Sequence, residues 1–392
     1  MRTTSARVRS VPPTIFSQMS ALAVRTGAVN LGQGFPDVDG PPSVIAEAVR
    51  ALEHGANQYA PGIGVPALRQ AIARHQQRHY GIELDPDSEV VVTTGCTEGI
   101  AAALLGLVDP GDEVVVLEPY YDSYVAMIEF AGGVRRPVTL RAPDHRLDPD
   151  ALRAAITRRT RLILLNTPHN PTGTVLTREE LQAVADVAIE HDLVVVTDEV
   201  YEHLVFDDAL SPEGHVPLST LPGMRERTLT LSSAGKSWSF TGWKVGWATG
   251  PRELVGAVLA AKQWLTFTSG SPLQPAVAHA LDHEPDFPAA LASSLQRRRD
   301  LLVAGLADAG LTARVPEGTY FATTDIRHLG WADGREFCLA LPEVAGVVAI
   351  PSIAFYDDHD EGRHLVRWAF CKEADVISEG VRRLAAADLH RR

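Results

Sequence analysis

The sequence has little positive charge for its size. Lys and Arg together number 36 against 49 Asp and Glu, which gives a formal net charge of -13. Nucleic acids and anionic membrane surfaces would repel such a chain at long range, so neither is expected as a partner. A long apolar run is also missing, because the longest one, GIAAALLGLV at 99–108, is too short to span a bilayer.

Cysteine is scarce as well. The three cysteines, Cys96, Cys338 and Cys371, are far apart and odd in number, which is not the spacing of a disulfide framework or a metal site. The acidic stretch DDHDEGRH at 357–364 also lacks regular ligand spacing and is interpreted as a solvated loop, so no metal is expected. The first residues, MRTTSARVRSVPPTIF, contain no apolar stretch of signal-peptide length. Together these features predict a reduced, cytoplasmic protein.

The sequence does contain a regular alternation of short apolar runs and longer helical stretches. Between about residues 89 and 250, runs such as EVVVTT, EVVVLE, RLILLN and LVVVTDE alternate with stretches such as TREELQAVADVAIEH. Short β-branched runs predict buried strands, and strands alternating with helices predict a mostly parallel sheet covered on both faces. The predicted fold class is therefore α/β.

The chain is expected to have two domains, because 392 residues are more than one core usually holds. Residues 1–45 are rich in Gly and Pro and are interpreted as an irregular N-terminal arm and part of a small domain. Residues 46–280 are expected to form a large domain around the sheet. Residues 281–392, which begin with the long helical stretch FPAALASSLQRRRDLLVAGLADAG, are expected to complete the small domain.

Four polar stretches directly follow predicted strands. They are TTGCTEG at 93–99, NTPHNPTG at 166–173, TDEVY at 197–201 and SSAGKSWSFTGWK at 232–244. Each one alone can be explained by turn or helix-capping chemistry. Ligands bind beyond the carboxyl ends of parallel strands, however, and together the stretches bring a lysine, an aspartate, an asparagine and a tyrosine to that edge. This combination predicts a functional site.

The four stretches, together with VNLGQGFPD, NQYAPGIGVPALR, EPYYDSY and HLVRWAFCK, resemble the fold-type I pyridoxal-phosphate aminotransferases of class I/II in order and approximate spacing. The resemblance covers nearly the whole chain and is closest to the branch of kynurenine/glutamine transaminases and N-succinyldiaminopimelate aminotransferases. It implies pyridoxal 5'-phosphate as the cofactor in the large domain and a homodimer with shared active sites. It also implies ping-pong transfer of the α-amino group of an L-amino acid to a 2-oxo acid.

The resemblance further implies how the cofactor is held. Lys236 is implied as the catalytic amine, which bonds to the cofactor and moves a proton at the substrate α-carbon. Asp198 is implied as the partner of the pyridine nitrogen. The remaining ring contacts are expected from Asn170 and Tyr201 at the phenolate oxygen and from Tyr121 on the ring face, with Tyr120 as the alternative.

The phosphate is expected at the start of a helix, where free N–H groups favour an anion. Its implied partners are three backbone amides, one hydroxyl and one ammonium group, from Gly95, Cys96, Thr97, Ser233 and Lys244. Tyr59 matches a tyrosine that reaches the phosphate of the neighbouring subunit.

The substrate α-carboxylate is implied to bind Arg367 through two parallel hydrogen bonds, with help from Gly34 and Asn170. Phe16 and Phe267 are expected at the substrate pocket. The sequence departs from the kynurenine-type pattern there, because Phe16 replaces a tryptophan, Thr97 a tyrosine and Thr268 a histidine. These replacements leave fewer stacking partners for a bulky aromatic donor. The stretches AKQWLTFTSGSPLQPAVAHALD at 261–282 and EFCLALPEVAGVVAIPSIAFYDD at 336–358 look more like the N-succinyldiaminopimelate branch. That resemblance favours a longer, polar-ended donor, with kynurenine, methionine and glutamine as the other candidates.

Other interpretations remain at this point. A cysteine-conjugate β-lyase could use the same scaffold, and a cofactor-binding regulator would need a DNA-binding domain for which residues 1–45 leave no room. The G-x-G-x-x-A match GIGVPA at 62–67 follows no apolar strand, which disfavours a dinucleotide site. The S-x-x-K match SAGK at 233–236 has no K-T-G triplet after it, which disfavours a serine acyl hydrolase.

Overall fold

The computed structural model describes residues 4–9 and 14–391, and its largest sheet has seven strands. The strand β8 runs antiparallel to both of its neighbours, and all other pairs are parallel. The predicted α/β class with a mostly parallel sheet is therefore confirmed. In spatial order the strands are β2 (Val90–Thr93), β8 (Gly246–Thr249), β7 (Thr228–Ser233), β6 (Val194–Asp198), β5 (Thr160–Asn166), β3 (Glu113–Glu118) and β4 (Val134–Thr139).

Both faces of this sheet are buried, as its continuous apolar strands predict. In β3, Val114 and Val116 pack into one core cluster, whereas Val115 and Leu117 pack into another. Successive side chains of a strand point to opposite faces, so a strand that is apolar at every position needs a helix layer on each side. The first cluster is covered by α5 (Gly95–Leu107), α6 (Asp122–Ala131) and α10 (Arg252–Lys262), and the second by α7 (Pro149–Ala155) and α8 (Arg178–Glu190).

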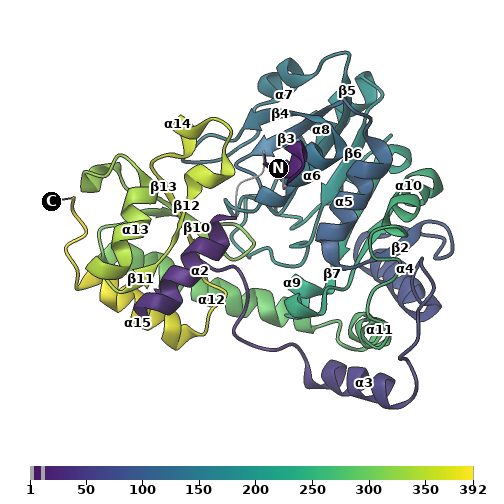
Figure 1. Cartoon of the computed structure of the whole chain (residues 1–392), viewed down its shortest axis with the longest axis horizontal. Coiled ribbons are helices and arrows are strands. Elements are labelled where there is room, and N and C mark those ends of the chain that lie inside the picture. The colour runs from purple at the N-terminus through teal and green to yellow at the C-terminus, as the bar shows by residue number, and fades with distance from the viewer. Residues whose placement is uncertain (1–3, 10–13, 392) are drawn as a thin grey trace.

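A third core cluster covers the end of the sheet that carries β2. Val90 and Val92 pack there against apolar side chains from three further helices. One of these helices, α11, packs against both of the others, and Figure 1 shows all three in the lower right part of the molecule. They are α3 (Pro42–Glu53), α4 (Pro66–Tyr80) and α11 (Leu273–His283).

A smaller part of the molecule is built around a four-stranded antiparallel sheet. Its strands, in spatial order, are β12 (Ile350–Pro351), β13 (Leu365–Ala369), β10 (Phe321–Asp325) and β9 (Ala313–Arg314). Beside this sheet, β1 (Val29–Asn30) pairs in parallel with β11 (Val347–Val348), so an N-terminal segment lies among C-terminal elements. Figure 1 shows this part at the left, with α12 (Phe287–Asp308), α13 (Gly334–Val344) and α15 (Ala374–Ala385) packed around it.

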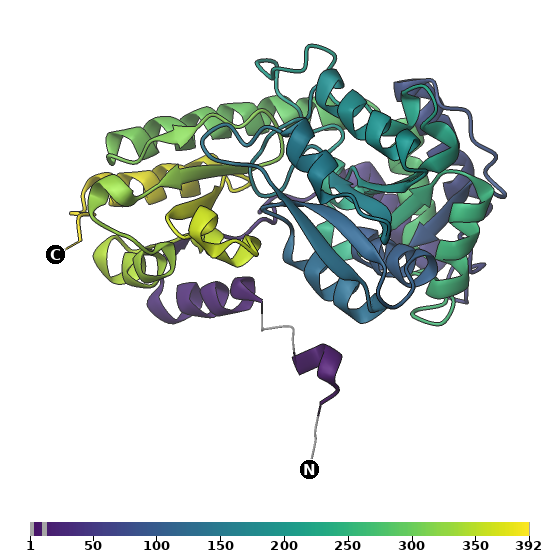
Figure 2. The same cartoon turned by 90° about the horizontal axis from the view of Figure 1, so that it is seen from above.

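The expected irregular conformation of residues 1–45 is wrong for residues 15–26, which form the helix α2 (Ile15–Thr26). Thr14 caps its first turn, and Gly27 ends it with φ of 65°. The buried side chains, among them Met19 and Leu22, follow a helical period that the flanking Pro and Gly residues masked. In Figure 2, α2 lies on the side of the smaller part opposite to α12. The domain boundaries at 45/46 and 280/281 stay a prediction.

The remaining elements are short. They are the helices α1 (Ala6–Arg9), α9 (Ala234–Ser237) and α14 (His359–Gly362) and the 3-10 turns η1 (Leu218–Thr220), η2 (Arg225–Arg227), η3 (Thr241–Trp243), η4 (Arg327–Leu329) and η5 (Ser352–Phe355). Within residues 4–9 and 14–391, none of the helices combines the length and the apolar character that a membrane crossing needs.

Candidate active site

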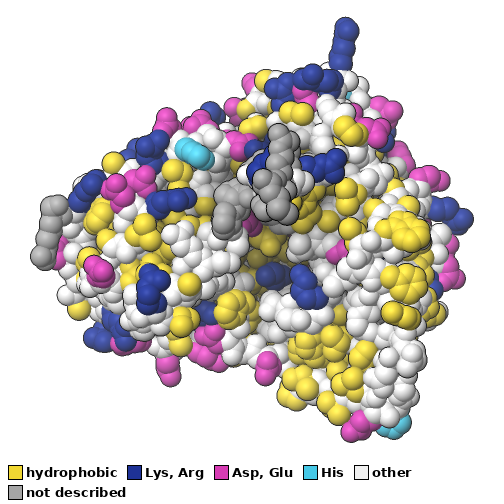
Figure 3. Space-filling view, in the orientation of Figure 1, with side chains coloured by type: hydrophobic (Ala, Val, Ile, Leu, Met, Phe, Trp, Pro, Cys, Tyr) yellow, Lys and Arg dark blue, Asp and Glu magenta, His cyan; other side chains and the backbone are white. Residues whose placement is uncertain are grey.

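A cavity of about 300 Å³ lies at the carboxyl edge of the large sheet. The ends of β5, β6 and β7 and the start of α5 line it from the larger part, and segments of the smaller part close it from the other side. In the view of Figure 3 the surface is hollowed between the two parts, with Lys or Arg side chains visible inside the hollow. The cavity brings together all but two of the predicted site residues: Phe16, Gly34, Gly95, Cys96, Thr97, Tyr121, Asn170, Asp198, Tyr201, Ser233, Lys236, Lys244 and Arg367.

Lys236 enters the cavity from the short helix α9, directly after β7. Its Nζ donates a hydrogen bond of 2.7 Å to Tyr320 Oη, and Tyr320 Oη in turn donates to the carbonyl oxygen of Gly34 at 2.6 Å. Burial lowers the pKa of Lys236 to about 8, and the positive charges of Lys244 and Arg367 act in the same direction. The amine is therefore far more often neutral than a surface lysine, as a nucleophile requires.

Asp198 ends β6 and is almost completely buried. Its Oδ2 accepts a hydrogen bond of 2.6 Å from Tyr124 Oη, and its Oδ1 accepts weaker ones from Cys96 Sγ at 3.4 Å and Val200 N at 3.3 Å. Burial raises the pKa of Asp198, while the hydrogen bond from Tyr124 opposes that shift. The carboxylate is thus fixed in place, with a cationic partner as its natural ligand in the cavity.

The start of α5 and Lys244 form one end of the cavity. Gly95 opens the helix with φ of 70°, and a methyl group added there would stand 3.2 Å from Lys244 Nζ. Lys244 itself has φ of 55° at the end of η3, and β8 begins two residues later at Gly246. Ser233 ends β7 beside this group. Free helix N–H groups and an ammonium group together attract a phosphate or another anion.

Arg367 reaches the cavity from β13 and is only 1% exposed. Its Nη2 donates to the carbonyl oxygen of Gly32 at 2.9 Å, its Nη1 donates to Asn170 Oδ1 at 3.3 Å, and its Nε has no hydrogen-bond partner. The guanidinium group lies 4.0 Å from the centre of the Phe321 ring. Burial lowers the pKa of Arg367 to about 10. A buried cation with unused donors is suited to bind a carboxylate.

The two adjacent tyrosines have different surroundings. Tyr121 lines the cavity, whereas the Tyr120 hydroxyl donates a hydrogen bond of 2.7 Å to Asp357 outside it. The geometry therefore places Tyr121 where a bound ring could stack.

Asn170 and Tyr201 also line the cavity. Asn170 is held by a hydrogen bond of 2.8 Å from its backbone N–H to Asn166 Oδ1. Tyr201 is buried and packs edge-on against the Tyr320 ring, with centroids 5.2 Å apart. Two tyrosines at the site were missed from sequence. Tyr124 lines the cavity and follows Tyr121 by three positions within the quoted EPYYDSY stretch. Tyr320 contacts Lys236 from outside the lining, and no local pattern in the sequence points to it.

Tyr59 and Phe267 do not line the cavity. Tyr59 is 85% exposed, and its ring packs edge-on against Phe267 at a centroid distance of 5.6 Å. Trp264, in the same loop as Phe267, is 84% exposed. The loop is fixed to the start of α5 through Thr266, whose hydroxyl contacts Thr94 and Glu98. These exposed aromatic side chains therefore stand beside the anion-binding end of the cavity.

The sequence profile of the family described as "Aminotransferase class I and II" matches residues 26–377. A Mycobacterium tuberculosis protein named probable N-succinyldiaminopimelate aminotransferase is 53% identical over 393 residues, which cover 97% of this chain and 98% of that protein. The methionine aminotransferase of Escherichia coli is 41% identical over 371 residues, 95% of each chain. The solved structure of the N-succinyldiaminopimelate aminotransferase from Mycobacterium tuberculosis has a TM-score of 0.95, with 53% identity, and the match covers 98% of this chain and 100% of that one.

Proposed function

The chain belongs to the class I and II aminotransferases, and on that premise we propose that its amino donor is a long, polar-ended amino acid of the N-succinyldiaminopimelate kind. The protein is a pyridoxal-phosphate-dependent enzyme that moves the α-amino group of an amino acid to a 2-oxo acid. The observation that carries the choice of donor is the 53% identity to a relative named for that substrate. Since the relatives are named aminotransferases, a β-lyase is not favoured.

The cavity lining supports a donor without a bulky aromatic side chain. Thr97 contributes a small side chain to the lining. The Phe16 ring already packs on Phe355, with centroids 5.8 Å apart, and lies 4.9 Å from the Arg367 guanidinium group. An aromatic substrate therefore has less ring surface on which to stack.

The donor can be tested by single half-reactions. The holoenzyme is mixed with N-succinyldiaminopimelate, methionine, kynurenine or glutamine, and the loss of the bound cofactor's absorbance is followed. We expect the largest kcat/KM for N-succinyldiaminopimelate. A larger value for methionine, for which the 41% identical relative is named, would replace this proposal with a methionine aminotransferase.

The cavity has the donor set that pyridoxal phosphate needs. An amine with a lowered pKa, a buried carboxylate and an anion-binding helix start line the same space. Glycine at position 95 keeps the space between the helix start and Lys244 open, as the 3.2 Å approach of an added methyl group indicates. When bound there, the cofactor supplies an aldehyde carbon that carries the amino group and a ring that accepts electrons.

We assign two proton-handling roles. Lys236 Nζ, with its pKa of about 8, takes the proton from the substrate α-carbon and returns one in the second half-reaction. Asp198, held by Tyr124, would keep a proton on the pyridine nitrogen of the cofactor, because a buried carboxylate favours a cationic partner.

The remaining residues would hold and orient the cofactor and the substrate. The helix start at 95–97, Ser233 and Lys244 would bind the phosphate. Tyr121 would stack on the ring, while Asn170 and Tyr201 would hydrogen-bond its phenolate oxygen. Arg367, with Gly34 and Asn170 beside it, would bind the α-carboxylate that both substrates share, so one arginine serves both half-reactions.

A homodimer is proposed from the exposed aromatic side chains beside the cavity. Tyr59, Trp264 and Phe267 expose large apolar surfaces next to the start of α5, and such surfaces favour a protein partner. In a dimer, Tyr59 would reach the phosphate of the other subunit. Light scattering tests this, because a fully active monomer would contradict shared active sites.

A cytoplasmic location is proposed from the cysteines. All three are buried and free. Unpaired cysteines are typical of proteins kept in a reducing compartment. Fractionation of cells that express the chain, with the activity followed in each fraction, tests the location.

A further inference from the structure

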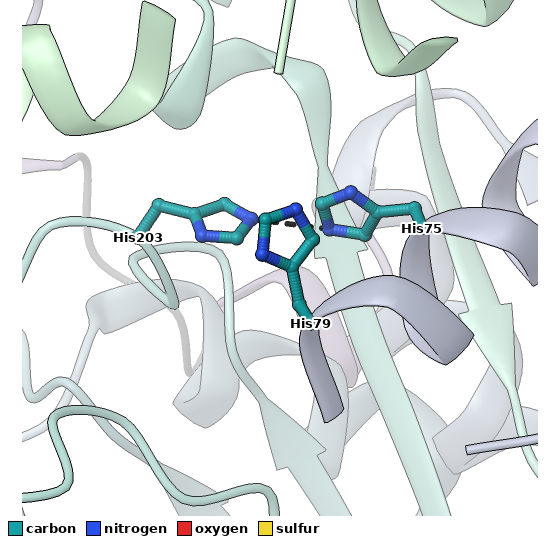
Figure 4. A group of neighbouring side chains, drawn as sticks. All are labelled: His75, His79 and His203. Carbon is teal, nitrogen blue, oxygen red and sulfur yellow. Dashed lines mark hydrogen bonds between the residues drawn. The ribbon is translucent and has the colours of Figure 1, made fainter. Parts of the chain in front are cut away.

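Three histidines lie close together outside the cavity lining. His75 and His79 lie four positions apart on α4 and so share one face of that helix, and His203 lies in the turn after β6. Their ring centroids are 4.5, 5.0 and 4.8 Å apart. Figure 4 shows His75 and His203 pointing toward each other from opposite sides, with the His79 ring between them in the view.

We propose that His75, His79 and His203 form a binding site for a divalent transition-metal ion of the Zn²⁺ class. Each ring offers one nitrogen, and the three nitrogens lie within 4.8 Å of one another. Among the residues that the structure describes, this is the one group of three or more His, Cys, Asp or Glu side chains with such an arrangement. Imidazole nitrogen is a preferred ligand of Zn²⁺, Co²⁺ and Ni²⁺.

The distances are close to those of a tetrahedral site. His75 Nε2 and His203 Nε2 are 3.1 Å apart. Zn–N bonds of about 2.0–2.1 Å in a tetrahedron place two ligand nitrogens about 3.3–3.4 Å apart, so a small movement of the side chains is enough. The third ring, on the same helix face as His75, needs only to turn its nitrogen toward this pair.

Glu202 supplies negative charge next to this group. Its Oε2 lies 3.7 Å from His75 Nε2 and 3.9 Å from His203 Nε2, and it is fixed by hydrogen bonds of 2.7 Å from Tyr80 Oη and 2.5 Å from Ser232 Oγ to its two oxygens. A held carboxylate at this distance stabilises a cation and can offer an oxygen ligand after a small shift.

The cluster is also accessible to solvent, and one of its ring nitrogens lacks a hydrogen-bond partner. His79 is exposed, so an ion can reach the group from solvent. His75 is buried, and its Nδ1 has no hydrogen-bond partner, so hydrogen bonds alone do not offset the burial of this ring.

The competing interpretation is a hydrogen-bonded histidine cluster that only joins α4 to the turn after β6. The two are separated by titrating the holoenzyme with Zn²⁺ in a calorimeter and with Co²⁺ in a spectrophotometer. The variant is His79→Ala, since this ring is exposed and lies outside the cavity lining. The matched control is His283→Ala, which removes one ring of the i,i+4 pair His279 and His283 on α11, whose centroids are 4.6 Å apart.

The wild-type enzyme and His283→Ala are expected to bind one Zn²⁺ at this site with the same affinity. The affinity of His79→Ala for Zn²⁺ is expected to be at least tenfold lower. Co²⁺ should give a visible ligand-field absorption with the first two proteins and not with His79→Ala. Zn²⁺ should also raise the Tm of those two proteins more than that of His79→Ala, because an ion that binds the folded state stabilises it. Unchanged transamination by His79→Ala shows that the variant is folded.

Absence of Zn²⁺ binding by the wild-type holoenzyme would overturn the proposal. Equal losses of affinity in His79→Ala and His283→Ala would overturn it as well, because the binding would then not depend on this cluster.

Discussion

Replacing Arg367 by lysine keeps a positive charge in the cavity but removes the planar group that can donate two parallel hydrogen bonds. In the structure each Nη of Arg367 makes one contact, to Gly32 and Asn170, and Nε makes none, so donors remain for a carboxylate. Loss of one charge-assisted hydrogen bond costs about 1.5–3 kcal/mol. This corresponds to roughly a 10- to 150-fold decrease in kcat/KM.

The decrease should be equal for the two half-reactions. The amino donor and the 2-oxo acid share only the α-carboxylate, and a single buried guanidinium group faces the place where it would bind. Stopped-flow measurement of the cofactor absorbance gives kcat/KM for each half-reaction separately. The control is Arg363→Lys, because Arg363 is exposed and pairs with Asp360 at 2.9 Å, and a surface pair of this kind contributes little.

The reasoning is refuted if Arg367→Lys weakens one half-reaction more than tenfold and leaves the other unchanged. It is also refuted if Arg363→Lys has the same effect, since the loss would then reflect a general change in stability rather than the carboxylate contact. Measuring the Tm of both variants shows whether the fold is retained.

Lys236→Ala should abolish amino transfer, and borohydride should no longer fix the cofactor to the chain; fixation at a different single lysine would show the assignment to be wrong. In the wild-type apoprotein, cofactor attachment should accelerate with a midpoint near the Lys236 pKa of about 8, at which pH only about 0.4% of an ordinary lysine is neutral; a midpoint near 10 would contradict the lowered pKa. Tyr124→Phe removes a 2.6 Å hydrogen bond to a buried carboxylate and should lower the free energy of unfolding, measured in urea, by about 1.5–3 kcal/mol. An unchanged urea midpoint would show that this hydrogen bond does not stabilise the fold. Gly95→Ala should weaken cofactor binding, measured by equilibrium titration, by more than the roughly 1–2 kcal/mol that a left-handed conformation costs a residue with a Cβ. Gly27→Ala is its control, with φ of 65° and nothing within 4 Å of the added carbon, and equal affinities of the two variants would count against the steric argument.

The large sheet could be predicted because its signals are local. A strand such as β3 is apolar at every position, and α8 begins with a capping box in which Thr177 and Glu180 bond to each other's backbone N–H groups. The helix α2 was missed although its apolar side chains are spaced as on one helix face, because the surrounding Pro and Gly residues suggested an irregular segment. A pattern of apolar spacing is therefore a better guide here than the composition of the flanking residues.

The cavity could be predicted where its residues follow strands, because parallel strands bring their carboxyl ends to one edge. Lys236 and Asp198 are of this kind. Tyr320 could not be predicted in this way, because it belongs to the smaller part of the molecule and is 84 positions from Lys236, which it contacts. The histidine group was missed for the same reason: His75 and His203 are 128 positions apart, and only the fold brings them together.

The turn after β6 connects the cavity with the histidine group. Tyr201 lines the cavity, Glu202 accepts a hydrogen bond from Ser232 on β7, and His203 meets His75 on α4, so three consecutive side chains point to three different places. A substitution of His203 would therefore alter a residue only two positions from Tyr201. Its effect on metal binding could not be separated from an effect on the cavity. A change at His79 leaves this turn intact, because His79 belongs to α4. Metal binding can for this reason be changed independently of transamination only by a substitution on α4, such as His79→Ala.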